Sequence, residues 1–564
     1  MLSSRRFVIL LALLSLMAAL SVPTFANAVS AESKVSVGSP PTPYLPNGIN
    51  EPALAMDANH PAVLAAGAND LVDNSPCQGS NCDLTPDIGI SGIYFSFNSG
   101  ETWTQPTYTG LTAQDGTGSH VGPIHTLPNY FENGMSSHGD PALAFGPRPG
   151  PGGFSWANGS RLYYANLAFP IPGRAPFTGA SAATVSRTDN VQAAAANVQS
   201  AWMDPVIVSR QNSALLSDKE DIWADNASSS AFFGNVYVCN TAFRSVGGPP
   251  QPIMLSASSD GGSTWRQRQL TSAVSNAQSG GRQGCAVRTD SAGVVYVVWE
   301  GTAAGQSVFY LARSSDGGSN FEKPFPVATV HDVGAPDPVS GRIVFDGLAG
   351  TRTDSFPSLS IANGAPTGSD ATNTLVLTWP DAGANNQLNQ ERALVQTSVN
   401  RGVTWSAPVN ATQAGDRADN PAVAISPNGT DLYLVYNGYL DPFRTTTADP
   451  RRMQGVARHA DVGAGGAVGS FTTLHRGAVG DARGSTRTLN RELIYDYQFA
   501  AATRNYGAVV WIDARDATVC PAVNAYRQSL IDGSPIPPPH PLTDCPPEFG
   551  NTDIYSGSYL DPTP

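Results

Sequence analysis

The sequence predicts an all-β protein built as a single β-propeller of four-stranded blades, with seven blades favoured and six as the alternative. Three observations support this prediction. The 564 residues include 56 Gly and 45 Pro, while charged residues are only 14% of the chain, which is typical of a turn-rich β protein. Hydrophobic residues form 41% of the chain, enough for a substantial core. A short strand pattern also recurs along the sequence.

Residues 1–28 have the features of a secretory signal peptide. Arg5 and Arg6 form a basic start, an apolar run extends from Phe7 to Leu20, and Ala26-Asn27-Ala28 matches an A-x-A cleavage site. The apolar run is shorter than the roughly 20 residues that a membrane-spanning helix needs. We therefore expect a secreted, extracellular protein without a membrane span in the mature chain. Residues 29–45 are expected to form an N-terminal linker and residues 46–564 the propeller.

A segment that starts with polar residues and continues with small and apolar ones occurs seven times. Each copy is followed by a second β-rich run, such as GVVYVVWEG or YGAVVWIDA, bounded by turn-forming residues. The copies begin at Pro52, Pro141, Asp221, Cys285, Pro357, Pro421 and Asp496. Successive starts lie 64 to 89 residues apart, which is long enough for four strands and their loops. Radial repetition of four-stranded sheets fits this spacing.

A second motif is SSDGGSTW, from Ser258 to Trp265, which fits the pattern S-x-D-x-G-x-T-W and has near copies in SFNSGETW, SSDGGSNF and SVNRGVTW. Its third residue can hydrogen-bond the turn backbone, its Gly accepts a positive φ, and its aromatic residue packs onto the sheet. These motifs resemble the Asp boxes, or BNR repeats, of secreted bacterial propellers in the sialidase superfamily. The resemblance implies that each box closes the hairpin between the outer two strands of a blade. We expect structural roles for Asn98, Asp260, Asp316 and Asn400.

The resemblance does not extend to the catalytic arginines of sialidases. Sialidases hold the substrate carboxylate with three arginines, the first of them in an F-R-I-P type motif. That motif is absent here, and no Arg occurs between Arg6 and Arg148. Neutral groups replace a bidentate guanidinium contact only at a large loss, so an ordinary exo-sialidase is not expected. The arginines that could be recruited instead are Arg282, Arg288, Arg352, Arg417 and Arg515.

The starts of the first strands and the ends of the second strands are acidic, and in a propeller these positions converge on one mouth of the central channel. The strand starts carry Glu51, Asp140, Glu220, Asp221, Asp354, Asp419 and Asp496, and the strand ends carry Asp70, Glu300, Asp381 and Asp513 with Arg515. Crowded carboxylates raise some pKa values, which makes acid and base partners of identical groups. For any single carboxylate, capping of a turn is the structural alternative.

Three clusters at this mouth are the candidates for chemistry: His138 with Asp140, Lys219 with Glu220 and Asp221, and Tyr495 with Asp496 and Tyr497. Lys219 either forms a structural ion pair, which we favour, or orients a catalytic carboxylate. The expected catalytic residues are Asp140, Glu220, Asp221, Asp496 and Tyr497. The expected substrate-binding residues are Glu51, His138, Glu300, Asp381, Arg417, Asp513 and Arg515. Trp299, Trp379 and Trp511 recur in register and are predicted to lie in the core.

Six cysteines in an exported chain predict three disulfides. Local spacing suggests Cys77 with Cys82 and Cys520 with Cys545, which leaves Cys239 with Cys285. Acid–base chemistry by paired carboxyl groups requires no cofactor. The oxygen-rich loop that contains Asp70, Asp73, Asp83 and Asp87 is suited to a structural Ca²⁺.

Two classes of function fit these observations. The first is a secreted glycoside hydrolase that uses paired carboxylates at the mouth of the channel. The second is a non-catalytic extracellular propeller that binds a glycan, a polysaccharide or a cell-surface protein. The formal charge of −13 argues against nucleic acid as the general partner. We expect a monomer, and the sequence leaves both classes open.

Overall fold

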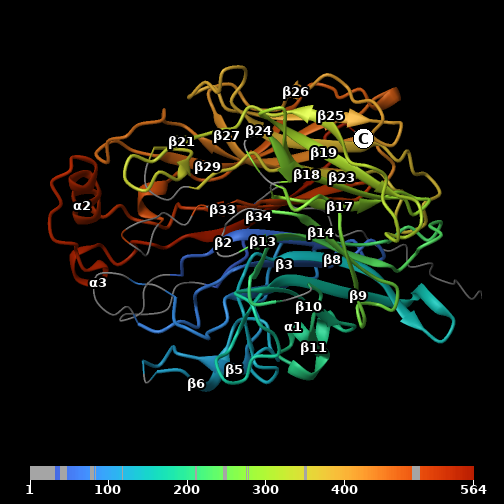
Figure 1. Ribbon diagram of the computed structural model, residues 1–564, viewed down its shortest axis with the longest axis horizontal. Coiled ribbons are helices and arrows are strands. Elements are labelled where there is room, and N and C mark those ends of the chain that lie inside the picture. The colour runs from blue at the N-terminus through green and yellow to red at the C-terminus, as the bar shows by residue number, and fades with distance from the viewer. Residues whose placement is uncertain are drawn as a thin grey trace, which may run out of the picture.

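The computed structural model describes residues 32–37, 47–76, 82, 84–116, 118–209, 212–244, 251–274, 276, 278–281, 283–347, 352–485, 489, 494 and 496–563. The molecule is 45% strand and 6% helix, and its blades form a seven-membered ring (Figure 1). This confirms the seven-bladed prediction over the six-bladed alternative. The expected signal peptide, Cys77, Asp83, Arg282 and Tyr495 lie outside the described residues.

Blades one to three follow the chain from the inside of the ring outward. Blade one contains β2 (Asn50–Met56), β3 (Leu64–Asn69) and β4 (Ser91–Ser96), with one bridge from Phe95 to Thr104 in place of a fourth strand. Blade two contains β8 (Ala142–Gly150), β9 (Gly153–Pro170), β10 (Ala182–Thr188) and β11 (Trp202–Ile207), with β7 (Met135–Ser137) beside β9. Blade three contains β12 (Leu215–Ala224), β13 (Val236–Arg244), β14 (Ile253–Ser258) and β15 (Arg266–Gln269).

Blades four to six repeat this order. Blade four contains β17 (Ala286–Thr289), β18 (Val295–Ala303), β19 (Gln306–Ser314) and β20 (Phe325–Thr329), with β16 (Ser279–Gly281) paired to β18. Blade five contains β23 (Ser358–Ile361), β24 (Leu375–Asp381), β25 (Arg392–Ser398) and β26 (Val409–Asn410). Blade six contains β27 (Arg417–Ile425), β28 (Asp431–Tyr439), β29 (Arg452–Asp461) and β30 (Thr472–Arg476), with β31 (Gly480–Asp481) on β29.

Blade seven combines both ends of the described chain. It contains β32 (Phe499–Ala502), β33 (Tyr506–Asp513) and β34 (Asp553–Leu560), and its outermost strand is β1 (Glu32–Lys34), antiparallel to β34. The expectation of a linker over residues 29–45 is therefore wrong for residues 32–34. Pairing with β1 satisfies the backbone groups of β34 that would otherwise form an open edge. Lys34 Nζ adds an ion pair to Asp553 Oδ2 at 2.6 Å.

The remaining elements lie in the segments that connect blades and strands. These are the hairpins β5 (Tyr108–Thr112) with β6 (His120–Ile124) and β21 (Ala335–Pro336) with β22 (Ile343–Val344), the helices α1 (Val191–Ala195), α2 (Pro521–Ile531) and α3 (Pro541–Asp544), and three short 3₁₀ turns at Gln199–Ala201, Ala464–Gly466 and Ala482–Gly484. No helix of the described segments is long and apolar enough to cross a membrane.

The core lies between neighbouring blades, where apolar side chains of adjacent sheets pack together. Trp299, Trp379 and Trp511 occupy matching positions on the second strands of blades four, five and seven and are almost fully buried. The prediction that these three residues belong to the core is confirmed. Burial of such large rings on equivalent strands gives these three blades a common packing unit.

Among the described residues, two of the predicted disulfides are present. Cys239 on β13 pairs with Cys285 just before β17, which links blade three to blade four. Cys520 pairs with Cys545 in the segment that joins β33 to β34 and carries α2 and α3. Because Cys77 lies outside the described residues, the pair of Cys77 with Cys82 stays a prediction.

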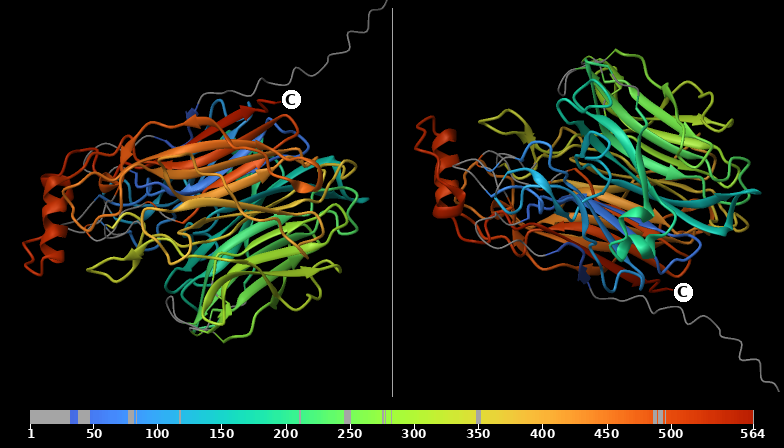
Figure 2. Two further views of the ribbon diagram at one scale, coloured as in Figure 1. Left: turned by 90° about the horizontal axis from the view of Figure 1, so that it is seen from above. Right: turned by 90° about the horizontal axis from the view of Figure 1, so that it is seen from below.

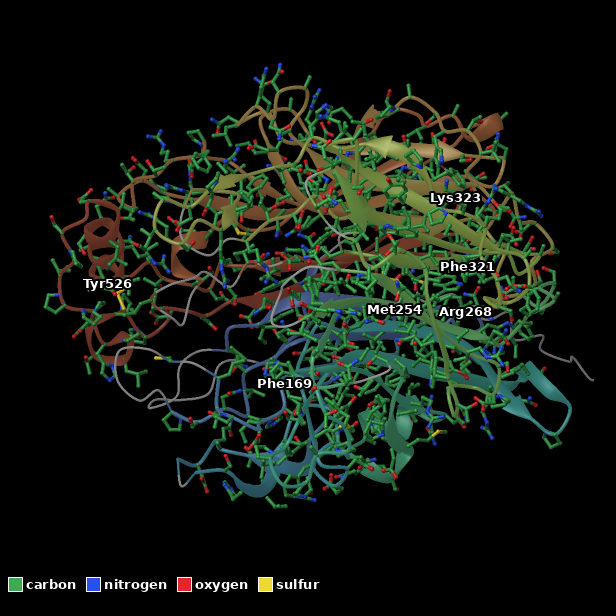
Figure 3. The ribbon with its side chains drawn as sticks, in the orientation of Figure 1. Phe169, Met254, Arg268, Phe321, Lys323 and Tyr526 are labelled. Atoms are coloured by element: carbon green, nitrogen blue, oxygen red, sulfur yellow. A yellow bond between two sulfur atoms is a disulfide. The ribbon has the colours of Figure 1, made fainter. Side chains whose placement is uncertain are left out.

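We call the mouth the edge of the ring where first strands start and second strands end. The β33–β34 connection leaves from this edge, and α2 lies at the left of the molecule, at the opposite side from the C-terminus (Figures 1 and 2). The turn that ends at Phe321 joins the outer strands β19 and β20 of blade four. Figure 3 shows Phe321 and Lys323 at the opposite side from Tyr526 of α2. The mouth and the outer turns therefore lie at different ends of the ring.

Candidate functional site: the mouth of the ring

The first strands of several blades share an unusual backbone conformation at the mouth. The residues with positive φ at this position are Glu51 (50°), Asp140 (52°), Lys219 (58°), Gly284 (68°) and Asn420 (49°). In blades one, three and six the position falls at a register shift between the first and second strands. A bulge re-aims side chains, and left-handed backbone at non-glycine residues is uncommon and concentrates at functional sites. This repeated bulge places charged side chains from several blades at the mouth.

Lys219 lies at the centre of the resulting cluster. Its Nζ is 2.6 Å from Asp496 Oδ2, 3.4 Å from Asp140 Oδ2 and 3.8 Å from Glu51 Oε1. The lysine side chain is only 4% exposed. The ring of Tyr497 lies beneath the ammonium group, 4.7 Å from Nζ to its centroid. Lys219 therefore forms buried ion pairs with carboxyl groups of blades one, two and seven, and its role as a structural ion pair stays a prediction.

Arg352 supplies a second cation from the connection between blades four and five. Its Nη2 is 2.5 Å from Asp496 Oδ2 and its Nε donates to Asp496 Oδ1 at 3.2 Å, while Nη2 is 3.5 Å from Glu51 Oε1. The Arg352 side chain is 41% exposed, in contrast to Lys219. Asp496 is therefore held between a buried cation and one that faces solvent.

The pKa values of the carboxyl groups around Lys219 are shifted in different directions. Burial alone would raise the pKa of Asp140, but Lys219, a hydrogen bond from Glu51 and Arg352 lower it to about 2. Burial and the charge of Asp140 raise the pKa of Glu51 well above its usual value. Asp218 also hydrogen-bonds Asp140, and burial raises its pKa to about 7. The cations thus keep the pKa of Asp140 low, whereas burial raises the pKa values of its neighbours Glu51 and Asp218.

A cavity of about 610 Å³, including its open part, lies beside this cluster. Phe356 and Tyr497 line it, with their rings stacked at 6.3 Å between centroids. Asp354 also lines the cavity and hydrogen-bonds Glu300 and Gln283. Burial and the charges of Asp332 and Asp496 raise the pKa of Asp354 to about 6. The cavity therefore combines aromatic faces with a carboxyl group that can give up a proton near neutral pH.

The channel continues along the first strands as a second cavity of about 970 Å³, which shares Arg288, Leu359 and Phe499 with the first. At the end opposite the mouth, Trp156 Nε1 donates to the carbonyl oxygens of Asn226 and Pro366, both at 3.2 Å. These hydrogen bonds connect β9 to segments that follow the first strands of blades three and five.

Glu220 and Asp221, both predicted to be catalytic, are buried and line the same cavity as Asp354. Neither Glu220 oxygen has a hydrogen-bond partner among the described residues, and burial together with the charges of Asp140 and Asp218 raises its pKa well above the usual value. Asp221 Oδ2 is 2.6 Å from Arg288 Nη1 and accepts from the Val287 backbone N at 2.9 Å. Asp221 thus joins blade three to blade four.

The residues predicted to bind substrate fall into two groups. Glu51 lies in the Lys219 cluster, and Glu300 contacts Asp354. His138 stacks on Phe169 at 3.6 Å, and burial lowers its pKa to about 4.

The other four predicted binding residues are engaged in contacts within the fold. Asp381 accepts from Trp379 Nε1 at 3.2 Å, and Asp513 accepts from Trp511 Nε1 at 3.1 Å. Arg515 binds both Asp513 and Glu32 of β1. Arg417 binds Glu391 and the Phe345 carbonyl oxygen. These side chains hold loops and blades together around the mouth rather than joining the Lys219 cluster.

Sequence reasoning missed part of the site. Asp218 and Phe356 were not singled out, Arg352 was one of five arginines without preference, and Asp354 was only one strand-start acid among several. A signal for Asp218 was present, because it aligns with Asn50 and Asp419 as the last paired residue before the bulge. The contact of Arg352 with Asp496 joins residues 144 positions apart and has no local signal.

In the four outer turns, the predicted Asp or Asn side chain accepts hydrogen bonds from backbone N–H groups of the same turn. Asp260 Oδ1 accepts from the backbone N of Ser263 and of Thr264, both at 2.9 Å. Asp316, Asn98 and Asn400 accept from the backbone N four residues later at 2.8 to 3.0 Å. The side-chain and backbone N–H groups of Asn320 lower the pKa of Asp316 to about 2.

In the loop expected to suit calcium, protein donors reach the carboxylates of Asp70 and Asp73. Asp70 accepts from Tyr94 and Gln105, at 2.7 and 2.8 Å. Asp73 accepts from the backbone N of His125 and from Thr126 Oγ1.

No known family model matches the sequence, and no curated protein matches it. Among solved structures, the chain is similar to a Hadza microbial sialidase at 12% identity and a TM-score of 0.38, covering 69% of this chain and 63% of that one. A Trypanosoma rangeli sialidase in complex with the inhibitor DANA gives 13% identity, a TM-score of 0.38 and coverage of 74% and 58%. The intramolecular trans-sialidase from Ruminococcus gnavus gives 10% identity, a TM-score of 0.37 and coverage of 72% and 92%. This chain thus spans less than two thirds of the length of the first two.

Proposed function

We propose that this protein is an exported propeller that acts on glycans, and that it hydrolyses glycosidic bonds at the mouth of the ring. The observation that carries the proposal is a pair of carboxyl groups at the mouth whose pKa values are shifted in opposite directions: Asp354 lines the cavity, and Asp140 contacts Lys219 and Tyr497, which also line it. Asp354 has its pKa raised to about 6, whereas that of Asp140 is lowered to about 2. Glycoside hydrolysis needs a protonated carboxyl group and an ionised one.

In this proposal Asp354 is the general acid and Asp140 is the ionised partner. Asp354 lines the cavity, so its proton can reach the oxygen of a bound leaving group. Of the three carboxylates that contact Lys219, Asp140 is the most exposed, at 14% against 1% for Glu51 and Asp496. Tyr497 lines the same cavity, and its hydroxyl lies 3.5 Å from Asp140 Oδ2. Asp140 is therefore the base or nucleophile in this proposal, because it is the most exposed of the three and lies next to a residue of the cavity wall.

The remaining groups favour a neutral sugar. Phe356 and Tyr497 offer ring faces on which a sugar can stack. The Nε–Nη2 edge of the Arg352 guanidinium is already bound to both oxygens of Asp496, so this edge is not available to a sugar carboxylate. The surrounding acids repel anionic ligands. We propose neutral glycans as the substrate class.

A non-catalytic glycan-binding propeller is the second candidate. It is favoured by the position of Lys219, whose ammonium group neutralises Asp140 and Asp496 together. A carboxylate paired with a cation is a weaker base, because protonation must first disrupt the pair. Under this alternative the ion-pair network shapes the mouth and the aromatic rings hold the sugar.

One experiment separates the two candidates. The mature chain and Asp354→Asn are tested on a glycan array and in a screen for released reducing ends. If the protein is a hydrolase, the wild type binds and cleaves a glycan, whereas Asp354→Asn binds the same glycan and cleaves it at least about 100-fold more slowly. Binding by both proteins without cleavage selects the binding propeller. If the wild type neither binds nor cleaves any glycan, both candidate functions are contradicted.

A further inference from the structure

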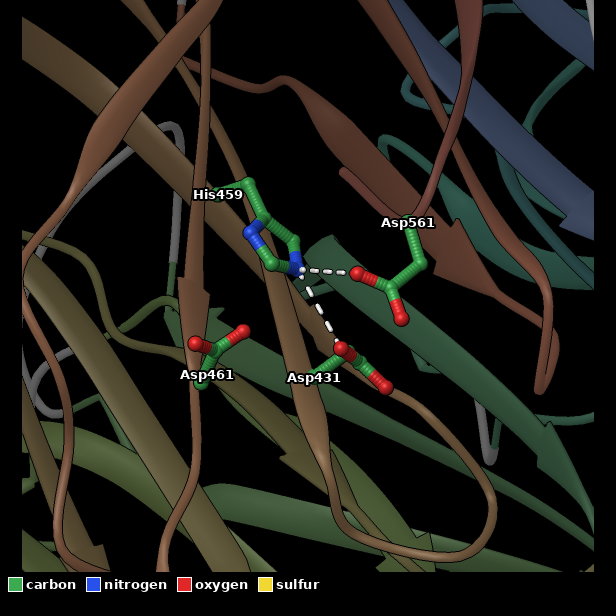
Figure 4. A group of neighbouring side chains, drawn as sticks. All are labelled: Asp431, His459, Asp461 and Asp561. Atoms are coloured by element: carbon green, nitrogen blue, oxygen red, sulfur yellow. Dashed lines mark hydrogen bonds and ion pairs between the residues drawn. The ribbon is translucent and has the colours of Figure 1, made fainter. Parts of the chain in front are cut away.

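A second cluster of ligand-type side chains lies far from the mouth, where blade six meets the end of blade seven. Asp431 begins β28 and Asp461 ends β29, and the two residues are directly opposite each other in the antiparallel register. His459 lies two residues before Asp461, so both side chains project from the same face of β29. Asp561 follows β34 of blade seven and approaches the same point (Figure 4).

The distances fit a single ion. His459 Nε2 lies 3.2 Å from Asp431 Oδ1 and 3.7 Å from Asp561 Oδ1. One ligand atom from each of Asp431, His459, Asp461 and Asp561 lies within 4.8 Å of all the others. Atoms bound to one cation at about 2.1 to 2.4 Å cannot be further apart than about twice that distance. The four donors can therefore surround one cation with small side-chain movements.

The charge of the cluster is unbalanced, which is a separate observation. Like charges directly opposite each other on paired strands are destabilising, and Asp431 and Asp461 are such a pair. In the described part of the chain, the ion pairs of these three aspartates involve His459 alone. His459 is 2% exposed and Asp431 5%. One imidazole carries at most one positive charge, so the three carboxylates leave the cluster with a net negative charge even when His459 is protonated.

We propose that Asp431, His459, Asp461 and Asp561 bind one divalent transition-metal cation of the zinc class. The imidazole nitrogen favours such an ion over calcium or magnesium, which prefer oxygen ligands alone. Binding requires His459 to be neutral, so that Nε2 offers its lone pair. The ring of His459 is held by packing against Tyr433, with centroids 5.1 Å apart.

The position of the site gives the ion a structural role. Three ligands belong to blade six, and the fourth follows the last strand of blade seven. Thr563 already bridges the two segments, because its hydroxyl lies 2.5 Å from Asp461 Oδ1 and 3.2 Å from Asp561 Oδ1. A bound cation would fasten the C-terminal segment to blade six and so stabilise the seam beside the blade that closes the ring.

The test uses the full mature chain, stripped with a chelator and then dialysed separately against Zn²⁺, Mn²⁺ and Ca²⁺. Bound metal is measured by mass spectrometry and the melting temperature by calorimetry. We expect one Zn²⁺ or Mn²⁺ per chain, a higher melting temperature with the ion, and weaker retention of Ca²⁺. Asp461→Asn and His459→Gln should each lose the bound ion and the rise in melting temperature.

Asp461 is exposed, so Asp461→Asn keeps the test decisive even where His459→Gln fails to fold. The matched control is His60→Gln, because His60 pairs with Asp57 at 3.2 Å and belongs to no such cluster in the described residues. The control should bind the ion as wild type does. Retention of the ion by Asp461→Asn, or failure of the wild type to bind either transition metal, would overturn the proposal.

Discussion

The mouth of the ring and its outer turns use the same residue type in opposite ways. At the turns, Asp260 is exposed and Asp316 half-buried, and both accept hydrogen bonds from residues within four positions of themselves. At the mouth, Asp140 and Asp496 are tied to Lys219, which is 79 and 277 positions away. Local hydrogen bonds lower a pKa in one place, whereas buried charges from several blades set it in the other.

This difference favours the mouth over the outer turns as the place of the function. A turn that satisfies its own carboxylate can be repeated in every blade, because its neighbours do not affect it. The mouth is not such a repeat, since five of the blades contribute five different residues: Glu51, Asp140, Lys219, Gly284 and Asn420 occupy one equivalent position. Variation at a fixed backbone position is expected where a scaffold carries a site.

The largest effect is expected from removing the central cation. Lys219→Met leaves Asp140 and Asp496 buried without their ammonium partner, which should lower the free energy of unfolding by about 3 to 5 kcal/mol. Urea unfolding measures it. Lys323→Met is the matched control, because Lys323 is exposed at the opposite side of the molecule from Tyr526 of α2 (Figure 3), and we expect no more than about 0.5 kcal/mol there. Equal urea midpoints for Lys219→Met and Lys323→Met would show that the buried ion pairs at the mouth contribute no more stability than an exposed lysine.

A smaller effect concerns pH. Burial raises the pKa of Asp419 to about 8, and its Oδ2 has no hydrogen-bond partner among the described residues. Because the folded pKa lies above the unfolded one, this group contributes stability below pH 4 that is lost as the pH rises through about 8. Asp419→Asn should therefore reduce the loss of stability between about pH 6 and pH 9 by about 2 to 3 kcal/mol.

Asp316→Asn is the corresponding substitution at an outer turn, and its effect on the pH dependence of stability is compared with that of Asp419→Asn. The pKa of Asp316 is lowered to about 2, so its contribution is lost only as the pH falls through that value. Thermal unfolding at several pH values should give a wild-type slope between about pH 6 and pH 9 for Asp316→Asn and a shallower slope for Asp419→Asn. Identical slopes in all three proteins would contradict the raised pKa of Asp419.

The smallest effect is expected at a single turn. Asp260→Ala removes the acceptor of two backbone N–H groups and of Thr264 Oγ1, but the turn is exposed and water can replace the lost partner. We expect a loss of about 1 kcal/mol in unfolding experiments, with glycan binding unchanged well below the melting temperature. A folded Asp260→Ala protein without glycan binding would move the active surface to the outer turns.

The sequence predicted the ring well because each blade repeats one pattern, whose inner strands and buried Trp299, Trp379 and Trp511 lie in register. It did not predict β1, since Glu32–Lys34 is three residues long and its partner β34 lies more than 500 residues away. At the site, Asp381 and Asp513 looked like mouth carboxylates. Each in fact stands two residues after a buried Trp and accepts its indole N–H, a W-x-D pattern that was visible in the sequence.

The central claim, that the mouth and not the outer turns carries the activity, is tested most directly by one substitution made in both regions. Asp354→Asn and Asp316→Asn are compared for release of reducing ends from the glycan that the screen selects, at equal fractions of folded protein. Asn already occupies the equivalent turn position at Asn98 and Asn400, so the rim substitution preserves the turn. We predict wild-type release by Asp316→Asn and a loss of at least about 100-fold by Asp354→Asn. Wild-type release by Asp354→Asn, with release lost in Asp316→Asn, would contradict the claim.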